Sequence, residues 1–118
     1  MKKNHVKLAK TVIDLEIQAL SKIKNSLGKS FNDAIELISK NQSKVILCGV
    51  GKSGIIASKI SATLSSVGTP SYTISASDSS HGDLGSISKK DILILISYSG
   101  NTQELKNIIQ YANRSRIK

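Results

Sequence analysis

The fold of this chain is decided by the stretch Val45-Ile46-Leu47-Cys48-Gly49-Val50-Gly51-Lys52-Ser53-Gly54. Its four apolar residues predict a short strand buried on both faces, and its three glycines predict a tight turn into a helix. Glycines in such a turn let backbone N–H groups approach an anion at the helix N-terminus, where the helix dipole is positive. The stretch therefore predicts a parallel α/β fold with an anion-binding crevice. A purely structural role, a tight turn with close packing of helix on strand, also accounts for the glycines.

The segments on either side of this stretch repeat the alternation of helix and strand. Two amphipathic helices are expected first, within residues 4–23 and 31–38, and further helices at residues 55–67 and 105–112. Residues 71–74 and 92–96 are the remaining strands. This order predicts a three-layer αβα sandwich with a flavodoxin- or Rossmann-like parallel sheet, in which the first strand lies between the second and the third. We expect one domain over residues 1–118, with N-terminal helices in 1–40 and the parallel α/β core in 44–118.

The third predicted strand, residues 92–96, lies at an edge of this sheet. It consists entirely of Ile and Leu, without the charge or proline that usually protects an exposed edge. We therefore expect a further strand to pair with it. We also expect the sheet of this chain to be incomplete and to expose apolar surface along that strand.

Composition narrows the classes of partner. The net charge is +9, but the lysines are scattered from Lys2 to Lys118 and no cluster of aromatic residues accompanies them, so we expect no nucleic-acid binding. No apolar run approaches the roughly 20 residues of a membrane span, and the basic start is not a secretory signal. Cys48 is the only cysteine, which excludes an intrachain disulfide and a cysteine-based metal cluster. We expect a cytoplasmic protein without metal or cofactor, and we expect the positive charge to favour a phosphorylated substrate only through its general field.

A second anion site is predicted at Ser97-Tyr98-Ser99-Gly100-Asn101-Thr102, directly after the third strand. Hydroxyl groups suit a phosphate monoester because they donate to its oxygens without adding fixed charge. The alternative is a capping box, in which Asn101 caps the following helix and Glu104 returns to the Asn101 backbone. Glu104 is also placed for general-base chemistry at the mouth of the crevice.

The segment between the second and third strands contains His81-Gly82-Asp83. Histidine has the unperturbed pKa that acid–base chemistry near neutrality requires, although a structural or solvated role for His81 is the alternative. A nicotinamide dinucleotide would require an acid at the end of the second strand, where Asp78 comes slightly late. A nucleotide-binding P-loop is excluded because Ile46 and Leu47 occupy the region where its first glycine is needed.

Four motifs in order resemble the SIS (sugar isomerase) domain of arabinose-5-phosphate isomerases: CGVGKSG at 48–54, GTPS at 68–71, SSHGDLGSI at 79–87 and SYSGNTQE at 97–104. The resemblance implies interconversion of ribulose 5-phosphate and arabinose 5-phosphate, which leads to 3-deoxy-manno-octulosonate for lipopolysaccharide or capsule. It also implies a homo-oligomer with active sites between subunits. Substrate-binding residues implied by the matching motifs are Gly51, Ser53, Ser97, Ser99, Gly100 and Thr102, and catalytic ones are Lys52, His81 and Glu104. Among them, Ser97, Ser99 and Thr102 would hold the phosphate, helped by the backbone of Gly51 and Gly100.

The resemblance assigns a role to each catalytic residue. Lys52 would stabilise oxyanion charge, while Glu104 would transfer protons through a cis-enediol intermediate, with His81 in the same region. Asp78 stands where many relatives carry glutamate, and Tyr98 where asparagine is common.

Relatives of this family continue beyond the length of this chain, supply a further glutamate and histidine, and often carry paired CBS domains. None of these is present in residues 1–118, so phosphosugar binding is expected more firmly than isomerase activity. The alternatives are a catalytically incomplete sugar-phosphate sensor and, from another class, a nicotinamide-binding half-domain.

Overall fold

A computed structural model describes residues 4–118, apart from the side chains of Ser80 and His81. The chain divides into two compact units, Met1–Leu37 and Ile38–Lys118, and each is described by itself. The first contains α1 (His5–Ser26) and most of α2 (Lys29–Ser39). Two N-terminal helices are therefore present, as the spacing of apolar residues predicted.

The first unit is held by local helical interactions. Asn4 caps α1, because its side-chain oxygen accepts a hydrogen bond of 3.0 Å from the N–H of Lys7. No residue of α1 is buried, although apolar side chains recur along it at helical spacing. Helices in proteins gain most of their stability from packing of such a face. In α1 the exposed large apolar residues are Val6, Leu8, Val12, Ile13, Leu15, Ile17, Leu20 and Ile23.

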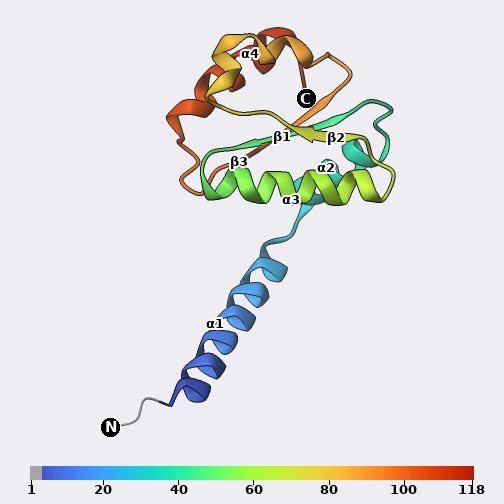
Figure 1. The fold of residues 1–118 in the computed structure, drawn as a ribbon. Helices are drawn as coiled ribbons and strands as arrows, with labels where there is room; N and C mark the ends of the chain where they lie inside the picture. The colour runs from blue at the N-terminus through green and yellow to red at the C-terminus, as the bar shows by residue number, and fades with distance from the viewer. Residues whose placement is uncertain (1–3) are drawn as a thin grey trace. The chain divides into compact units, whose positions relative to one another are not determined.

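The second unit is an α/β sandwich around a three-stranded parallel sheet (Figure 1). The strand order is β2-β1-β3, so the predicted position of the first strand between the other two is confirmed, and β3 is an edge strand as predicted. Helix α3 lies along one face of the sheet and α4 along the other (Figure 1). In chain order the unit contains β1 (Val45–Gly49), α3 (Lys52–Ser66), β2 (Ser71–Thr73), the 3-10 helices η1 (Asp78–His81) and η2 (Asp83–Ser86), β3 (Ile92–Ile96), the 3-10 helix η3 (Gln103–Leu105) and α4 (Lys106–Ser115).

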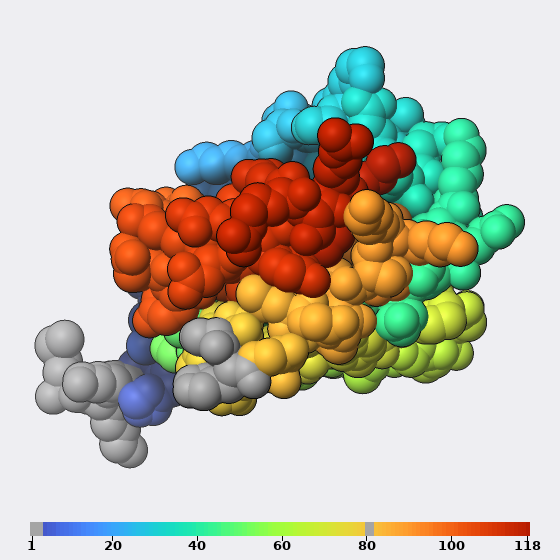
Figure 2. Space-filling view, turned by 90° about the horizontal axis from the view of Figure 1, so that it is seen from above, coloured from blue at the N-terminus to red at the C-terminus, as the bar shows by residue number. Residues whose placement is uncertain are grey.

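The core lies on both faces of β1. Residues Val45 to Cys48 are fully buried, as expected of a central parallel strand covered by helices on both sides. Ile46 and Cys48 join the cluster beneath α4, together with Ile108. Viewed from that side, α4 and the segment that connects β2 with β3 cover the sheet (Figure 2).

A buried carboxylate ties together the amino ends of β1 and β3. Asp91 is only 1% exposed. Its Oδ1 accepts hydrogen bonds from the hydroxyl of Ser43 at 2.5 Å and from the N–H of Lys44 at 3.2 Å, and its Oδ2 accepts one from the N–H of Ser88 at 2.7 Å. The ammonium of Lys44 lies 3.7 Å from Oδ1. Ser43 and Lys44 directly precede β1, and Ser88 precedes β3. Asp91 therefore fixes the end of the sheet opposite the predicted crevice.

Candidate functional site

The two predicted loops lie side by side at the carboxyl edge of the sheet. β1 and β3 are parallel neighbours, and their register pairs Gly49 with Ile96, the last residue of each strand. Neighbouring strands are about 4.8 Å apart, so the turn at residues 49–54 and the loop at residues 97–102 start from adjacent positions. This is the edge at which open α/β sheets bind their ligands.

The glycines of the first loop have structural roles. Gly51 caps α3 with φ 60° and ψ −126°, a conformation that residues with a Cβ rarely adopt. A Cβ on Gly49 would lie 2.6 Å from the backbone of Ser53, and one on Gly54 would lie 2.7 Å from the carbonyl oxygen of Gly49. The alternative reading of this motif as a tight turn with close packing is therefore confirmed. The spacing of these glycines does not by itself indicate that the turn binds a dinucleotide.

The turn also leaves donors at the start of α3. The carbonyl of Gly51 accepts hydrogen bonds from the N–H groups of Gly54 and Ile55, at 3.0 and 3.3 Å. The N–H groups of Lys52 and Ser53 precede these bonds and belong to the first turn, in which the helix supplies no acceptor of its own. They lie at the amino end of α3, which is the positive end of the helix dipole. An anion at the carboxyl edge of the sheet finds donors here.

The second loop is organised by its own hydroxyl groups. The hydroxyls of Ser97 and Thr102 lie 2.6 Å apart, and the Ser97 hydroxyl also accepts a hydrogen bond of 3.0 Å from the N–H of Gly100. The hydroxyl of Ser99 accepts one of 3.1 Å from the N–H of Asn101. Gly100 has φ 70°, which reverses the chain within the loop. The structure thus brings Ser97 and Thr102 together, while Ser99 stays exposed.

The predicted capping box is not formed, and that interpretation was wrong. A capping box needs the acid at the third position of the helix. Here η3 follows Thr102, and α4 starts only at Lys106, so Glu104 lies before the helix it was expected to cap. The cap residues of η3 and α4 make no side-chain capping bond. Glu104 is left exposed.

The structure describes the side chains of only two of the three predicted catalytic residues. Lys52 is the first residue of α3 and is exposed, and Ser53 beside it is half-buried. Among the described residues, the side chains of Lys52 and Glu104 form no hydrogen bond or ion pair, with each other or with other groups. The side chain of His81 lies outside the described residues, although its backbone ends η1. That these three side chains act together stays a prediction.

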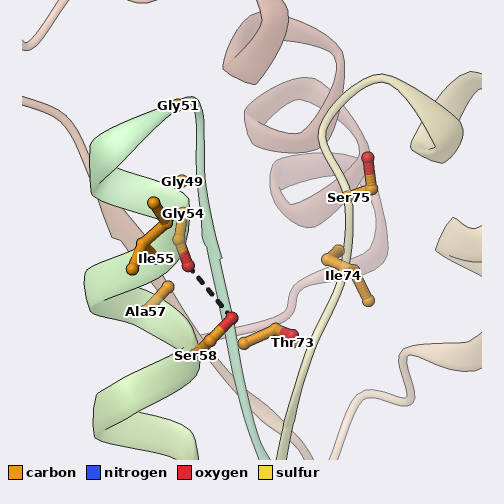
Figure 3. Close-up of a pocket in the computed structure, with 9 residues that line it drawn as sticks. All are labelled: Gly49, Gly51, Gly54, Ile55, Ala57, Ser58, Thr73, Ile74 and Ser75. Atoms are coloured by element: carbon orange, nitrogen blue, oxygen red, sulfur yellow. Dashed lines mark hydrogen bonds between the residues drawn. The ribbon is translucent and has the colours of Figure 1, made fainter.

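A hollow of about 300 Å³ opens on the side of β1 that faces away from β3, between α3 and β2 (Figure 3). It shares Gly49, Gly51 and Gly54 with the first loop but does not include the hydroxyl loop. Ser75 was not predicted as a site residue, although its place directly after the second strand is a signal that could have found it. The hollow is lined by Gly49, Gly51, Gly54, Ile55, Ala57, Ser58, Thr73, Ile74 and Ser75.

The excess positive charge is not focused on this edge. Lys44, Lys89 and Lys90 lie at the opposite edge of the sheet, directly before β1 and β3, and the carbonyl of Lys118 is bonded to β3 near the same end. The segments that follow the carboxyl ends of the strands contain both bases and acids, among them Lys52 and Lys106 and Asp78 and Glu104. Attraction of a phosphate therefore depends on local donors more than on the net charge of +9.

Other reactive groups contribute little to this site. Burial raises the pKa of the Cys48 thiol, which keeps it protonated near neutral pH. Among the side chains that the structure describes, no group of three His, Cys, Asp or Glu residues gathers as a metal would require.

Within residues 4–118, none of the helices has the combination of length and hydrophobicity that a membrane crossing demands.

Comparison with known proteins relates the chain to one family. The model of the SIS domain matches residues 37–118. The uncharacterised protein RP505 of Rickettsia prowazekii is 44% identical over 98% of this chain and 36% of its own length. The arabinose 5-phosphate isomerase KdsD of Francisella tularensis is 41% identical over 90% of this chain and 33% of its own. The chain therefore spans about a third of the length of these relatives.

A solved structure agrees with the sequence relatives. The protein c3406 of Escherichia coli CFT073, solved in complex with arabinose 5-phosphate, superposes with a TM-score of 0.87 at 37% identity. The superposition covers 97% of this chain and 62% of that one. Fold and sequence comparisons thus indicate the same family.

Proposed function

The chain belongs to the SIS-domain family, and we propose that it binds a phosphosugar at the carboxyl edge of its sheet. The proposed ligand is arabinose 5-phosphate or ribulose 5-phosphate. The observation that carries this proposal is the pair of hydroxyls of Ser97 and Thr102, 2.6 Å apart, beside the amino end of α3. The E. coli relative, whose structure contains arabinose 5-phosphate, supports the class of ligand.

The phosphate group takes the place between the two loops. The hydroxyls of Ser97 and Thr102, which are joined by one hydrogen bond in the structure, turn to phosphate oxygens when the ligand binds. Ser99 supplies a third hydroxyl, and the backbone of Gly100 and Gly51 allows close approach. Hydrogen bonds to a charged acceptor are about twice as strong as those between neutral groups, so this exchange is favourable. Ser53 contributes from the first turn of α3.

The chemistry proposed for the bound sugar is aldose–ketose isomerisation. A base removes a proton from C1 of ribulose 5-phosphate while the C2 carbonyl oxygen gains a proton, which gives a cis-enediol. Protonation of C2 with loss of a proton from the C1 hydroxyl then gives the aldose. Glu104 is the proposed proton carrier, since it is exposed directly after the hydroxyl loop. Lys52 stabilises the oxyanion of the enediol, and His81 assists proton transfer between oxygens.

The wider role proposed is that of the isomerase relatives, with the product directed to lipopolysaccharide or capsule. The protein is expected in the cytoplasm, and as a homo-oligomer. Support for association comes from α1, whose large apolar side chains are all about half exposed or more. Contiguous exposed apolar patches mark interaction surfaces.

Binding and turnover are tested separately. We expect arabinose 5-phosphate to raise the melting temperature of the chain. Ser97→Ala combined with Thr102→Val is expected to weaken the affinity, measured by calorimetry, at least about tenfold, because one charge-assisted hydrogen bond is worth about 1.5–3 kcal/mol. Ser66→Ala, at the far end of α3, is the matched control and leaves affinity unchanged. A folded sample that shows no stabilisation would refute phosphosugar binding.

Turnover is followed as aldose formed from ribulose 5-phosphate. Aldose that forms with the wild-type chain but not with Glu104→Gln or Lys52→Met supports isomerase activity. Ligand binding without product supports the sugar-phosphate sensor instead. Saturable NAD binding that survives Ser99→Ala and Thr102→Ala would favour the nicotinamide-binding class.

A further inference from the structure

A single tight turn connects the hydroxyl loop with α4. This turn is η3, which follows Thr102 and ends directly before Lys106, the first residue of α4. The N–H of Leu105 donates to the carbonyl of Thr102 at 3.2 Å, and the N–H of Lys106 donates to the carbonyl of Gln103. Both bonds join residues three apart, whereas an α-helix joins residues four apart.

The backbone of this turn is close to that of an α-helix. Leu105 has φ −83° and ψ −13°, and Lys106 has φ −60° and ψ −42°. Because ψ is about −42° in an α-helix, a change of about 30° at Leu105 brings it to the helical value. Thr102, with φ −72° and ψ 120°, already has the extended conformation of a residue that precedes a helix. A start of α4 at Gln103 therefore requires only a small movement of the backbone.

One buried N–H group favours the tight turn when no anion is bound. Leu105 is 3% exposed, so its N–H needs an acceptor within the protein. In the 3-10 turn that acceptor is the carbonyl of Thr102. In an α-helix that starts at Gln103, this carbonyl accepts from Lys106 instead, and the N–H of Leu105 belongs to the first turn, where the helix supplies no acceptor. Extending α4 therefore costs a hydrogen bond that only a ligand can replace.

The same change acts on the hydroxyl pair of Ser97 and Thr102. The rise per residue is about 2.0 Å in a 3-10 helix and about 1.5 Å in an α-helix, so the three residues of η3 shorten by about 1.5 Å on conversion. The body of α4 is held in the core by the fully buried Ile108, so the shortening moves Thr102 toward the helix. A shift of this size is sufficient to break the bond between the two hydroxyls, which lie 2.6 Å apart.

We propose that η3 is a conformational switch of the phosphosugar site. While Ser97 and Thr102 are bonded to each other, η3 is a 3-10 turn; when their hydroxyls bind a phosphate, η3 becomes the first turn of α4. The phosphate supplies the acceptor that the N–H of Leu105 then needs, at the positive end of a longer helix. This inference rests on the proposed function, which the E. coli relative solved with arabinose 5-phosphate supports.

The switch also reorients the proposed proton carrier. Successive residues are about 120° apart around a 3-10 helix and about 100° apart around an α-helix. Glu104 lies two residues before Lys106, so conversion turns it by about 40° around the axis of α4. Phosphate binding thus changes the direction of Glu104, and the base takes its final orientation only when the substrate is present.

Nuclear magnetic resonance and calorimetry on the full chain test this switch. With saturating arabinose 5-phosphate, we expect the Cα chemical shifts of Gln103, Glu104 and Leu105 to move to the α-helical values found within α4. Gln103 is exposed and is not among the proposed ligand contacts, so it is a suitable position for changing helix propensity. We expect Gln103→Ala to bind arabinose 5-phosphate about two- to fivefold more tightly than Gln103→Gly, where fivefold corresponds to the full difference in helix propensity between the two residues.

Gln110→Ala and Gln110→Gly are the matched pair of controls. Gln110 is exposed within α4 and is helical in both forms of the switch, so we expect equal affinities although the glycine variant melts at a lower temperature. Chemical shifts of Gln103–Leu105 that stay unchanged when calorimetry shows saturation overturn the switch alone, as do equal affinities of the two Gln103 variants. A wild-type chain that binds no arabinose 5-phosphate refutes the proposed function, and the switch with it.

Discussion

Replacing Asp91 with asparagine tests what holds the amino ends of β1 and β3 together. Both carboxylate oxygens accept hydrogen bonds, from Ser43 and Lys44 at Oδ1 and from Ser88 at Oδ2. An asparagine has one acceptor oxygen, so its NH₂ group must face a backbone N–H whichever way the amide turns. The loss of one or two charge-assisted hydrogen bonds at a buried position costs about 3 kcal/mol. For a domain of this size, that lowers the melting temperature by about 10 °C.

The pH dependence of this cost identifies the carboxylate as its source. Burial acts to raise the pKa of Asp91, but the hydrogen bonds from Ser43, Ser88 and Lys44, with the Lys44 ammonium, outweigh it and lower the pKa. A pKa lowered by folding stabilises the protein above the unfolded value of about 3.9, and this stabilisation is lost as the pH falls through the folded value. The difference in the free energy of unfolding between wild type and Asp91→Asn is therefore largest at neutral pH and becomes smaller in acid.

Urea unfolding followed by circular dichroism measures this difference at pH 7 and at about pH 3, below the unfolded pKa of an aspartate. Asp83→Asn is the control, because Asp83 is exposed and its replacement leaves stability nearly unchanged. An Asp91→Asn variant as stable as wild type at pH 7 would refute the assigned role. So would a difference that is the same at both pH values.

Three further predictions concern other parts of the chain. Gly51→Ala is expected to lower the free energy of unfolding by at least about 1 kcal/mol, because φ is 60° there; Gly28→Ala, where no atom lies within 4 Å of a new Cβ, is the control in the same denaturation assay. Cys48 is expected to react with a thiol reagent only on unfolding, since it is buried and its pKa is raised; rapid modification of the native chain would contradict this. Lys89→Glu with Lys90→Glu is expected to change arabinose 5-phosphate affinity less than about twofold in calorimetry at physiological salt, because charges beyond a Debye length of about 8 Å are screened. A larger loss would show that net charge drives binding.

The topology was predictable from the sequence because a few local patterns determine it. The run of four apolar residues before the glycine turn predicts a buried central strand. The order β2-β1-β3 follows from the right-handedness of the connections between parallel strands. The bare edge at Ile92–Ile96 followed from the same reasoning. These features depend on contacts between chain neighbours or on general rules of sheets.

The details of the second loop were less predictable. The spacing of Asn101 and Glu104 matches a capping box, yet the chain forms a short 3-10 helix first, and α4 starts at Lys106. The hydroxyl bond between Ser97 and Thr102 closes the loop in its place. Local sequence thus placed the hydroxyl groups of Ser97 and Thr102 in one loop but assigned the wrong helix start, which is the least reliable feature of such patterns.

Features that depend on distant residues were missed. Asp91 accepts from Ser43, which is 48 residues away in the chain, and no periodicity connects the two. The hollow between α3 and β2 combines Gly49 with Ser75, which only the fold brings together.

β3 carries the hydroxyl loop at its carboxyl end and the open edge along its side. Ser97 directly follows Ile96, so any segment that pairs with Leu95 restrains the backbone two residues before Ser97, whose hydroxyl is the first of the proposed phosphate ligands. Ordering the loop is part of the free-energy cost of ligand binding, and a strand that orders it in advance reduces this cost. Linkage is reciprocal, so arabinose 5-phosphate must then stabilise the paired edge by the same free energy. Extending the chain after Lys118 by Val-Thr-Val-Thr-Val, a segment able to pair with the outer edge of β3, is therefore expected to raise the affinity for arabinose 5-phosphate in calorimetry above that of a chain extended by Gly-Ser-Gly-Ser-Gly. Equal affinities for the two extended chains would show that the loop is already rigid without a neighbouring strand.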